Sequence, residues 1–268
     1  MRRLRRFVAG LVIVFALSAC ASEEAPYFEQ PVEDLYNIAM DLMLRENYAA
    51  AAVAFDEVER QHPYSVWATK AQIMTAYSNY QDNEYDEAIL AAKRFINLHP
   101  GHRDVGYAYY LVAISYYEQI SDIGRDQMMT ELAFESLEEI VRRFPDSVYA
   151  RDANLKINLT RDHLAGKEME IGRYYQTTGQ YIAAINRFRI IIEKYQTTSH
   201  VPEALLRLTE SYLALGVTDE AQATAAVLGH NFPGSEWYQD SYALLTGVKL
   251  RPKEDEGSWI GRAWNSVF

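Results

Sequence analysis

The sequence predicts an all-α protein, a superhelical α-solenoid of about five helix hairpins. Apolar residues recur at helical spacing along almost the whole chain, and no segment has a convincing period-2 strand pattern. A second observation is a repeated motif in which a proline ends one helix and a polar residue can cap the next. The motif occurs at residues 62–67 (HPYSVW), 144–149 (FPDSVY) and 232–237 (FPGSEW), with looser copies at 99–102 and 196–200.

A third observation is a fixed spacing between these motifs. An aromatic or polar residue is followed three positions later by alanine, and four positions after that by alanine or phenylalanine. The sets are Tyr48, Ala51 and Phe55; Tyr85, Ala88 and Ala92; Tyr181, Ala184 and Phe188; and Thr218, Ala221 and Ala225. The pattern resembles the tetratricopeptide repeat, whose small residues let two antiparallel helices approach closely. The fold class is therefore an array of tetratricopeptide-like hairpins.

The repeats are interrupted by insertions. We expect the helices of the third repeat near residues 106–119 and 130–143, with an insertion at 120–127 between them. A second insertion lies between the third and fourth repeats, where two helical stretches are expected to meet around Ala165 and Gly166. A closing helix is expected near residues 236–245.

The N-terminus has the features of an export signal. Four arginines precede an apolar run at residues 7–17, and small residues then lead to Cys20, the only cysteine. Residues 1–19 are predicted to be a signal peptide, because the run is too short to cross a bilayer. Small residues followed by cysteine resemble the lipobox of bacterial lipoproteins. That resemblance implies cleavage and lipidation at Cys20, with residues 20–32 as lipidated N-terminus and tether.

Composition and motifs argue against catalysis and nucleic-acid binding. Removal of the signal peptide would leave 22 basic and 37 acidic residues and change the formal net charge from −11 to −15. The chain has no phosphate loop, nucleophile elbow, paired-histidine zinc motif or Cys-x-x-Cys. We therefore expect no enzyme, cofactor or metal site, and we interpret His99 and His102 as turn residues.

Residues 33–145, which hold repeats one to three, are predicted to be a peptide-binding half. The resemblance implies that the first helix of each hairpin lines a concave groove. Five tyrosines within residues 107–117 span more than one helix face, so some must point out of the hairpin seam, although Tyr116 is assigned to packing. Tyrosine suits peptide binding in a wet groove. The predicted peptide-binding residues are Tyr36, Met40, Met43, Tyr77, Tyr80, Tyr107, Tyr110 and Tyr117.

Residues 146–250 are predicted to be a scaffold half, comprising an insertion helix, repeats four and five and the closing helix. Arg173, Arg187 and Arg189 lie in this half of an acidic protein. They are candidates for pairing with carboxylates of a docked partner. Simple solvent exposure is the alternative interpretation.

Residues 251–268 are predicted to be a linker and an amphipathic tail. A helix here would place large apolar residues on one face, namely Ile260, Trp264, Val267 and Phe268. The tail is either frayed or a docking helix for a partner or a membrane surface.

Several local segments together resemble the BamD family, lipoproteins of the machine that assembles β-barrel proteins into the bacterial outer membrane. They are residues 94–102 (RFINLHPGH), 141–147 (VRRFPDS), 161–168 (RDHLAGKE) and 172–175 (GRYY). The resemblance covers about residues 14–246. It implies that the first repeats receive the C-terminal targeting strand of an unfolded outer-membrane protein. It also implies that the last repeats dock on the periplasmic domain of the barrel-forming subunit, BamA.

The same resemblance implies a location and a set of partners. The partners are a BamA-type barrel subunit, other lipoproteins of the assembly complex and unfolded outer-membrane proteins, with no nucleic acid. Lipidated Cys20 would hold the chain on the periplasmic face of the outer membrane. The alternative function is a periplasmic tetratricopeptide scaffold for cell-envelope or cell-division complexes. A lipid-anchored hydrolase would need a catalytic cluster that the sequence lacks.

Overall fold

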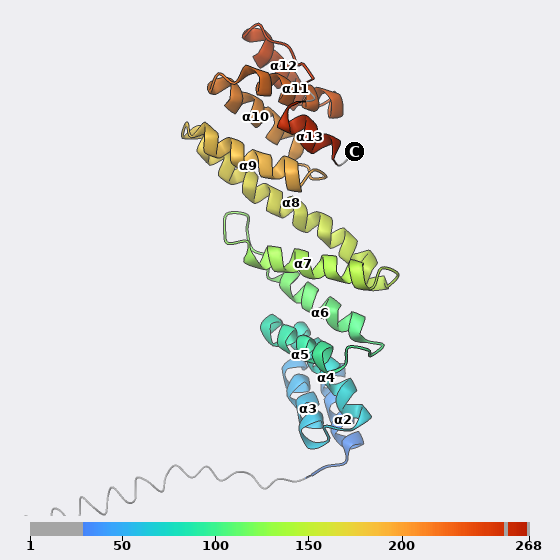
Figure 1. Ribbon diagram of the computed structural model, residues 1–268. Helices are drawn as coiled ribbons and strands as arrows, with labels where there is room; N and C mark the ends of the chain where they lie inside the picture. Colours follow the sequence, from blue (N-terminus) through green and yellow to red (C-terminus); the bar gives the residue numbers. More distant parts are fainter. Residues whose placement is uncertain (1–28, 255–256, 267–268) are drawn as a thin grey trace, which may run out of the picture.

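The computed structural model describes residues 29–254 and 257–266 and shows an elongated stack of helix pairs (Figure 1). The signal peptide, Cys20 and most of the tether lie outside these residues. Within them, no helix is both long and apolar enough to cross a bilayer. The helices are α2 (Val32–Leu44), α3 (Tyr48–Gln61), α4 (Val66–Gln81), α5 (Tyr85–Leu98), α6 (Val105–Glu118), α7 (Met128–Arg143), α8 (Val148–Thr177), α9 (Tyr181–Lys194), α10 (Val201–Ala214), α11 (Thr218–Asn231), α12 (Glu236–Gly247) and α13 (Trp259–Asn265).

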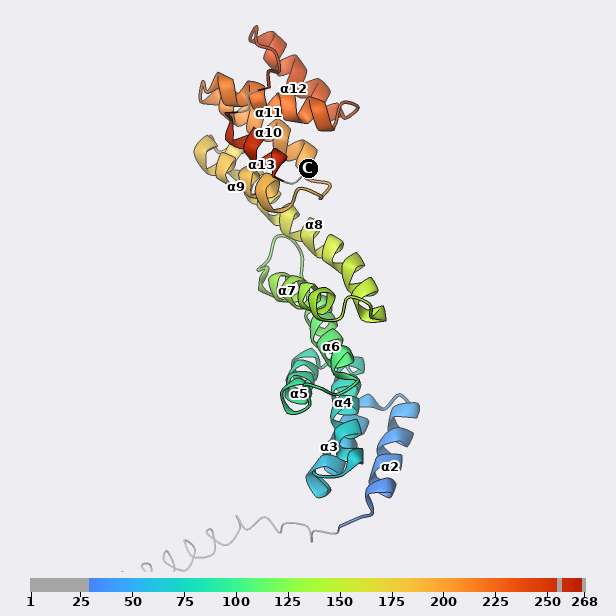
Figure 2. The same cartoon turned by 45° about the vertical axis from the view of Figure 1, so that its right-hand side comes forward.

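Consecutive helices pack as hairpins, α2 with α3, α4 with α5, α6 with α7, α8 with α9 and α10 with α11. We call the first helix of each pair the A helix and the second the B helix. Helix α12 closes the array against α10 and α11, and both views show the same stacking order (Figures 1 and 2). The described residues contain no strand. The fold class predicted from the sequence, an all-α solenoid of about five hairpins, is confirmed.

The repeated proline motif sets where several helices begin. The side chains of Ser65, Ser147 and Ser235 cap α4, α8 and α12, each accepting a hydrogen bond from the backbone N–H three residues on. These bonds satisfy donors that the first helical turn leaves free. Within two of the hairpins, the turn needs a left-handed residue, which Gly179 and Gly216 supply at φ values of +76° and +73°.

The core is a row of hairpin seams rather than one central mass. Phe55, Phe95 and Phe188 come from the B helices α3, α5 and α9 and are fully buried. Alanines of the repeat pattern, such as Ala51 and Ala184, are also fully buried and let the helices approach. Burying a phenylalanine contributes roughly 1.5–3 kcal/mol, so each seam carries its own hydrophobic stabilisation.

The expected meeting of two helical stretches at Ala165 and Gly166 is wrong. Helix α8 runs unbroken for 30 residues through both positions. Gly166 serves close packing instead, because a Cβ there would lie 2.9 Å from Ile123 Cδ1 and 3.2 Å from His200 Nε2. The glycine thus lets the 120–127 loop and the turn before α10 approach the helix. The cost of glycine inside a helix, about 1 kcal/mol, is offset by this packing.

Helix α8 joins the two halves of the array. Its first part packs against α7 and its last part against α9, and Figures 1 and 2 show it crossing between them. At the second contact, a Cβ on Gly172 would lie 2.3 Å from Cε1 of the buried Phe188. The insertion helix and the A helix of repeat four are therefore one continuous element.

The tail is helical, as expected, and the interpretation of it as a frayed segment is wrong for the described residues. Helix α13 folds back and packs against α9 and α11 of the same chain. Ile260 is fully buried there and Trp264 is 8% exposed. Val267 and Phe268 lie outside the described residues. The apolar face of the tail is therefore covered within the chain at its described positions, and docking on a separate partner or membrane stays a prediction.

Gly172→Ala should destabilise the protein, although alanine is ordinarily the better helix former by up to about 1 kcal/mol. The new methyl group would collide with Phe188, and overpacking of this kind costs roughly 1–3 kcal/mol. Thermal unfolding followed by circular dichroism should show a lowered midpoint. Gly101→Ala is the matched control, because nothing lies within 4 Å of its Cβ position and its φ is not positive. An unchanged midpoint for Gly172→Ala would show that the α8–α9 contact is looser than described.

Candidate functional site

The predicted peptide-binding residues of the first repeat cover its core. Tyr36 packs edge-on against the buried Phe55, with ring centroids 5.5 Å apart, and against Trp67 at 4.7 Å. Met40 and Met43 are partly buried on the same cluster of apolar side chains. Their exposed parts give the A helix α2 an apolar surface, but most of each side chain stabilises the hairpin.

A tyrosine cluster lies further along the array, on the A helices of repeats two and three and the start of α8. Its members are Tyr77, Tyr80, Tyr107, Tyr110 and Tyr149. The ring of Tyr149 lies 5.2 Å from that of Tyr110, nearly parallel to it, and 5.7 Å from that of Tyr107. All five side chains are partly buried, so each packs against the apolar core and still leaves part of its surface accessible. The structure thus brings four of the predicted residues together.

Charged groups border the tyrosine cluster. Tyr110 donates a hydrogen bond of 2.7 Å to Asp152 Oδ2, and Lys156 Nζ donates to both oxygens of the same carboxylate at 2.8 and 2.9 Å. Lys156 also lies 5.5 Å from the ring centroid of Tyr117, another predicted residue. Tyr80 Oη donates to Glu118 at 3.4 Å. The cluster is therefore an aromatic surface with a polar edge.

Burial raises the pKa of four of these tyrosines, namely Tyr80, Tyr107, Tyr110 and Tyr149. Burial, reinforced by the negative charge of Glu118, raises the pKa of Tyr80 to about 12. Burial is also the largest cause of the raised pKa values of Tyr107 and Tyr110. For Asp152, burial acts in the opposite direction, but hydrogen bonds from Lys156 and Tyr110 leave its pKa lowered. At neutral pH, the site presents uncharged rings beside an ionised carboxylate.

Tyr149 and Asp152 were missed at the sequence level because they belong to α8 rather than to a predicted A helix. A signal for Tyr149 was nevertheless present. It ends the motif at residues 144–149, as Trp67 ends the motif at 62–67. Trp67 packs on Tyr36 of the preceding A helix, and Tyr149 packs on Tyr110 of its preceding A helix. The last residue of the motif is thus an aromatic that reaches back to the A helix before it.

The three arginines predicted to dock a partner already have partners within the chain. Arg173 makes a two-pronged hydrogen bond to Glu203, and its Nε lies 2.9 Å from Oε1. Burial would raise the pKa of Glu203, but the hydrogen bonds and charge of Arg173 leave it lowered. Arg187 donates to Glu168 at 3.1 Å. Arg189 pairs with a carboxylate on its own helix at 3.0 Å and lies under the tail. None of the three is a free cation awaiting a carboxylate.

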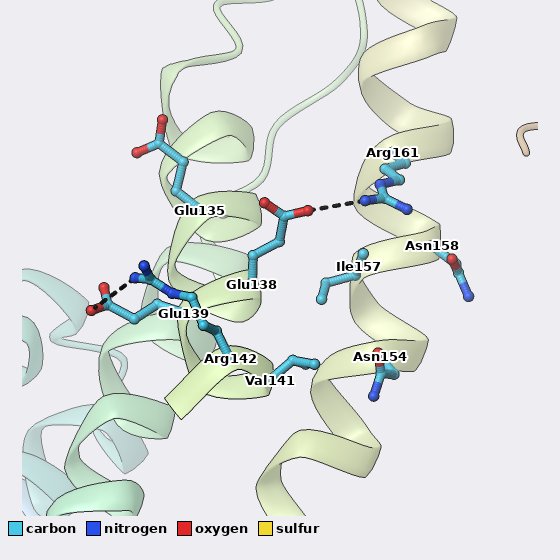
Figure 3. A pocket seen from close by; sticks show the side chains of 9 residues that line it. All are labelled: Glu135, Glu138, Glu139, Val141, Arg142, Asn154, Ile157, Asn158 and Arg161. Atoms are coloured by element: carbon cyan, nitrogen blue, oxygen red, sulfur yellow. Dashed lines mark hydrogen bonds and ion pairs between the residues drawn. The ribbon is translucent and has the colours of Figure 1, made fainter. Parts of the chain in front are cut away.

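A separate hollow of about 740 Å³ lies between α7 and the first part of α8 (Figure 3). An ion pair of 2.9 Å between Arg161 and Glu138 crosses it, and Arg142 pairs with Glu139 at 3.6 Å. The hollow is lined by charged and amide groups, and by helical periodicity its α8 residues lie on a different face from Asp152 and Lys156. Sequence reasoning did not identify it.

No candidate metal site accompanies these surfaces in the part of the chain that the structure describes. In the described part of the chain, no three histidine, cysteine, aspartate or glutamate side chains could together hold a metal ion. His99, interpreted from the sequence as a turn residue, follows α5 and hydrogen-bonds to Gln72 Oε1 at 2.9 Å.

Comparison with known proteins assigns the chain. A family model described as YfiO, outer membrane lipoprotein, matches residues 28–228. A curated relative from Caulobacter vibrioides, named outer membrane protein assembly factor BamD, is 49% identical over 91% of this chain and 82% of its own length. The chain belongs to the BamD family. A relative of the same name from Rickettsia prowazekii is 44% identical over 91% of this chain and 98% of its own.

The family resemblance stated from sequence motifs is therefore confirmed. BamD proteins are assembly factors with a repeat scaffold, and the chain is not an enzyme. Among solved structures, a tetratricopeptide-repeat protein of Thermus thermophilus is 20% identical, with a TM-score of 0.37, over 80% of this chain and 98% of that one. A likeness this loose adds nothing to the assignment. The matched segment spans the tyrosine cluster and all of α8 but ends inside α11, so the tail lies beyond it.

The raised pKa of Tyr80 makes stability depend on pH in a definite direction. The pKa of Tyr80 is about 12 in the folded protein and 10 ordinarily. The contribution of neutral Tyr80 to the free energy of unfolding is therefore fully present below pH 10 and is lost as the pH rises through 12. Between these values, the unaltered protein should lose stability relative to Tyr80→Phe, which cannot ionise. Urea unfolding of both proteins at pH 9 and pH 11.5 measures this difference. A constant difference at the two pH values would contradict the buried, neutral state of Tyr80.

Proposed function

We propose that this chain is a non-enzymatic, lipid-anchored scaffold that binds unfolded segments of outer-membrane proteins along its first three repeats. We further propose that its later repeats dock on a BamA-type barrel subunit. The observation that carries the proposal is the tyrosine cluster with its polar edge, which lies on the A helices and the start of α8.

Family membership supports the general role. The curated relatives are named outer membrane protein assembly factors, and the matching family is described as outer membrane lipoproteins. A role in outer membrane protein assembly and an association with that membrane follow for this chain. The lipid anchor at Cys20 and the periplasmic orientation are the proposed parts of this location.

The chemistry of the tyrosine cluster favours an extended peptide. In a strand, alternate side chains point to one face, so one row of apolar side chains can lie on a continuous aromatic surface. The rings of Tyr107, Tyr110 and Tyr149 supply such a surface, with centroids 5.2–5.7 Å apart. Asp152 and Lys156 at its edge can exchange hydrogen bonds with peptide backbone or polar side chains.

Docking through the arginines requires an exchange of partners. Arg173, Arg187 and Arg189 are half-exposed, so a carboxylate from another protein can approach them from solvent. The pair of Arg189 with Glu193 is exposed on both sides, and such pairs contribute only about 0–1 kcal/mol, so an external carboxylate can replace Glu193 at little cost. Glu203 is only 10% exposed, so taking Arg173 away from it carries a larger cost. The exchange of partners depends on the positive charge of the arginine. Reversing the charges of an arginine and its internal glutamate together therefore separates a docking role from a purely structural role.

Replacing Tyr107 and Tyr110 together by alanine should weaken binding of a C-terminal barrel-protein peptide. Buried aromatic anchors commonly contribute 2 kcal/mol or more each, so the dissociation constant should rise at least about tenfold. Fluorescence anisotropy titration measures the affinity, and circular dichroism checks that helicity is retained.

Tyr116→Ala is the control on the same helix, because Tyr116 lies outside the cluster and accepts a hydrogen bond from Lys93 of a B helix at 2.9 Å. Equal affinity for the double variant and the unaltered protein would remove the groove from the proposal.

Arg187→Glu should reduce association with the barrel subunit, but it also places two carboxylates opposite each other at Glu168. The double variant Arg187→Glu with Glu168→Arg restores the internal pair in reverse. If Arg187 docks a partner, the double variant should recover thermal stability without recovering association in co-purification. Recovery of both would show that Arg187 acts only within the chain.

A further inference from the structure

The tail helix α13 is held in a groove of the last two repeats by a small set of contacts. Ile260 is fully buried, and the ring of Trp264 meets Phe232 edge-on with centroids 6.2 Å apart. Both residues belong to the apolar cluster formed by α9, α10 and α11. Figures 1 and 2 show the helix lying across this end of the array. The groove therefore accepts two large apolar side chains of a short helix.

Polar contacts fix the start of the same helix. Trp259 donates its indole N–H to Tyr212 Oη at 2.9 Å, and its ring lies 4.2 Å from the guanidinium of Arg189. Ser258 donates a hydrogen bond of 2.7 Å to Glu220 Oε2. These contacts come from α9, α10 and α11, so the groove recognises the aromatic ring, its N–H and the preceding hydroxyl at once.

Helix α13 behaves as a ligand rather than as part of the repeat array. It has seven residues, and isolated helices shorter than about 12–15 residues are marginal in water, so its helicity depends on docking. Residues 248–258 connect it to α12, and among them Leu250 packs against the same apolar cluster while the Lys253 N–H donates to Gln222 O at 3.4 Å, so release of the tail also breaks these contacts. Such a segment can leave the groove without unfolding the repeats beneath it.

We propose that α13 is an autoinhibitory intramolecular ligand, in equilibrium with an undocked state, and that its groove can take a separate short helix of the same chemistry. That chemistry is a hydroxyl residue, a tryptophan and an aliphatic residue in succession, with a second aromatic four positions after the aliphatic one. The ring of Trp259 in the docked tail lies over the guanidinium of Arg189 and leaves that side chain 38% exposed, so the tail restricts approach to Arg189 without closing it off. In this one respect the inference rests on the proposed function, because Arg189 is one of the three arginines proposed to meet the barrel subunit.

The effect of the tail on peptide affinity follows from the concentration at which the tether holds the tail near its own groove. A short tether gives the undocked tail an effective concentration on the order of 1 mM at its groove. We take a dissociation constant of ~50 μM for a free peptide copy and the empty groove. The tethered tail is then docked about 20 times more often than it is undocked. Competition by the tail therefore lowers the apparent affinity of the peptide for the unaltered protein about 20-fold.

The test uses the full chain and a fluorescent peptide copy of residues 257–268. In the variant Ile260→Asp, the buried aspartate should expel the tail, so the peptide should bind this protein at least tenfold more tightly than the unaltered one. Ser266→Asp is the matched control, because it introduces the same charge at the exposed position that directly follows α13. A peptide carrying Ile260→Asp should bind none of these proteins.

Hydrogen exchange of α10 to α12 checks that the variant repeats remain folded. If Ile260→Asp unfolds these repeats, Trp259→Ala serves as a second variant. It removes only the contacts at the start of α13. Peptide binding that is absent in an intact variant, or equal in variant and unaltered protein, overturns the proposal. A dimer of the unaltered chain that excess peptide dissociates also overturns it, because the tail would then dock on a second copy.

Titration of the barrel subunit's periplasmic domain separates this inference from the proposed function. Tighter association with Ile260→Asp than with Ser266→Asp supports autoinhibition. If no form of the chain binds that domain, the docking function fails, while the peptide titration still decides the state of the tail.

Discussion

The unbroken helix α8 is the constraint on which the arrangement of this protein depends. It packs against α7 with its first part and α9 with its last, so one rigid element belongs to both halves of the array. Its start also contributes Tyr149, Asp152 and Lys156 to the candidate peptide surface. A helix cannot bend sharply without a proline, a bulge or an inserted group, and the glycines of α8 serve close contacts instead. The position of the candidate peptide surface relative to the last two repeats is therefore set by α8.

Much of this structure was predictable from residue patterns. Helical periodicity and the repeated proline motif identified the hairpins, because a proline and a serine cap act locally and leave their mark in sequence. The residues of the groove were predictable in part for the same reason, since A-helix tyrosines repeat with the hairpins. Tyr149 was missed although the motif at residues 144–149 contained it. The role of Tyr149 depends on how far its ring extends across the seam toward the preceding A helix. Packing of the helices sets this distance, and the spacing of residues in the sequence does not show it.

The features that could not be predicted are those decided by long-range contacts. The sequence around Gly166 indicates a possible helix break, but the close approach of Ile123 and His200 shows that the glycine serves packing. Arg173 reads as a free cation, yet Glu203 on the next hairpin neutralises it. The tail has the sequence of a docking helix, and it is one, but its groove is within the same chain. In each case the deciding partner lies tens of residues away. Local propensity carries no information about it.

Distance measurement between the two ends of the array tests most directly whether α8 holds the halves together. Spin labels at Tyr64, which is fully exposed, and at the exposed Asp240 on α12 report on this separation by double electron–electron resonance. The labels need only a Cys20→Ser background, because the chain has no other cysteine. A single narrow distance distribution, broadened when two glycines are inserted into the middle of α8, is the predicted result. A broad or multiple distribution in the uninterrupted protein would contradict the rigid coupling of the peptide surface to the docking repeats.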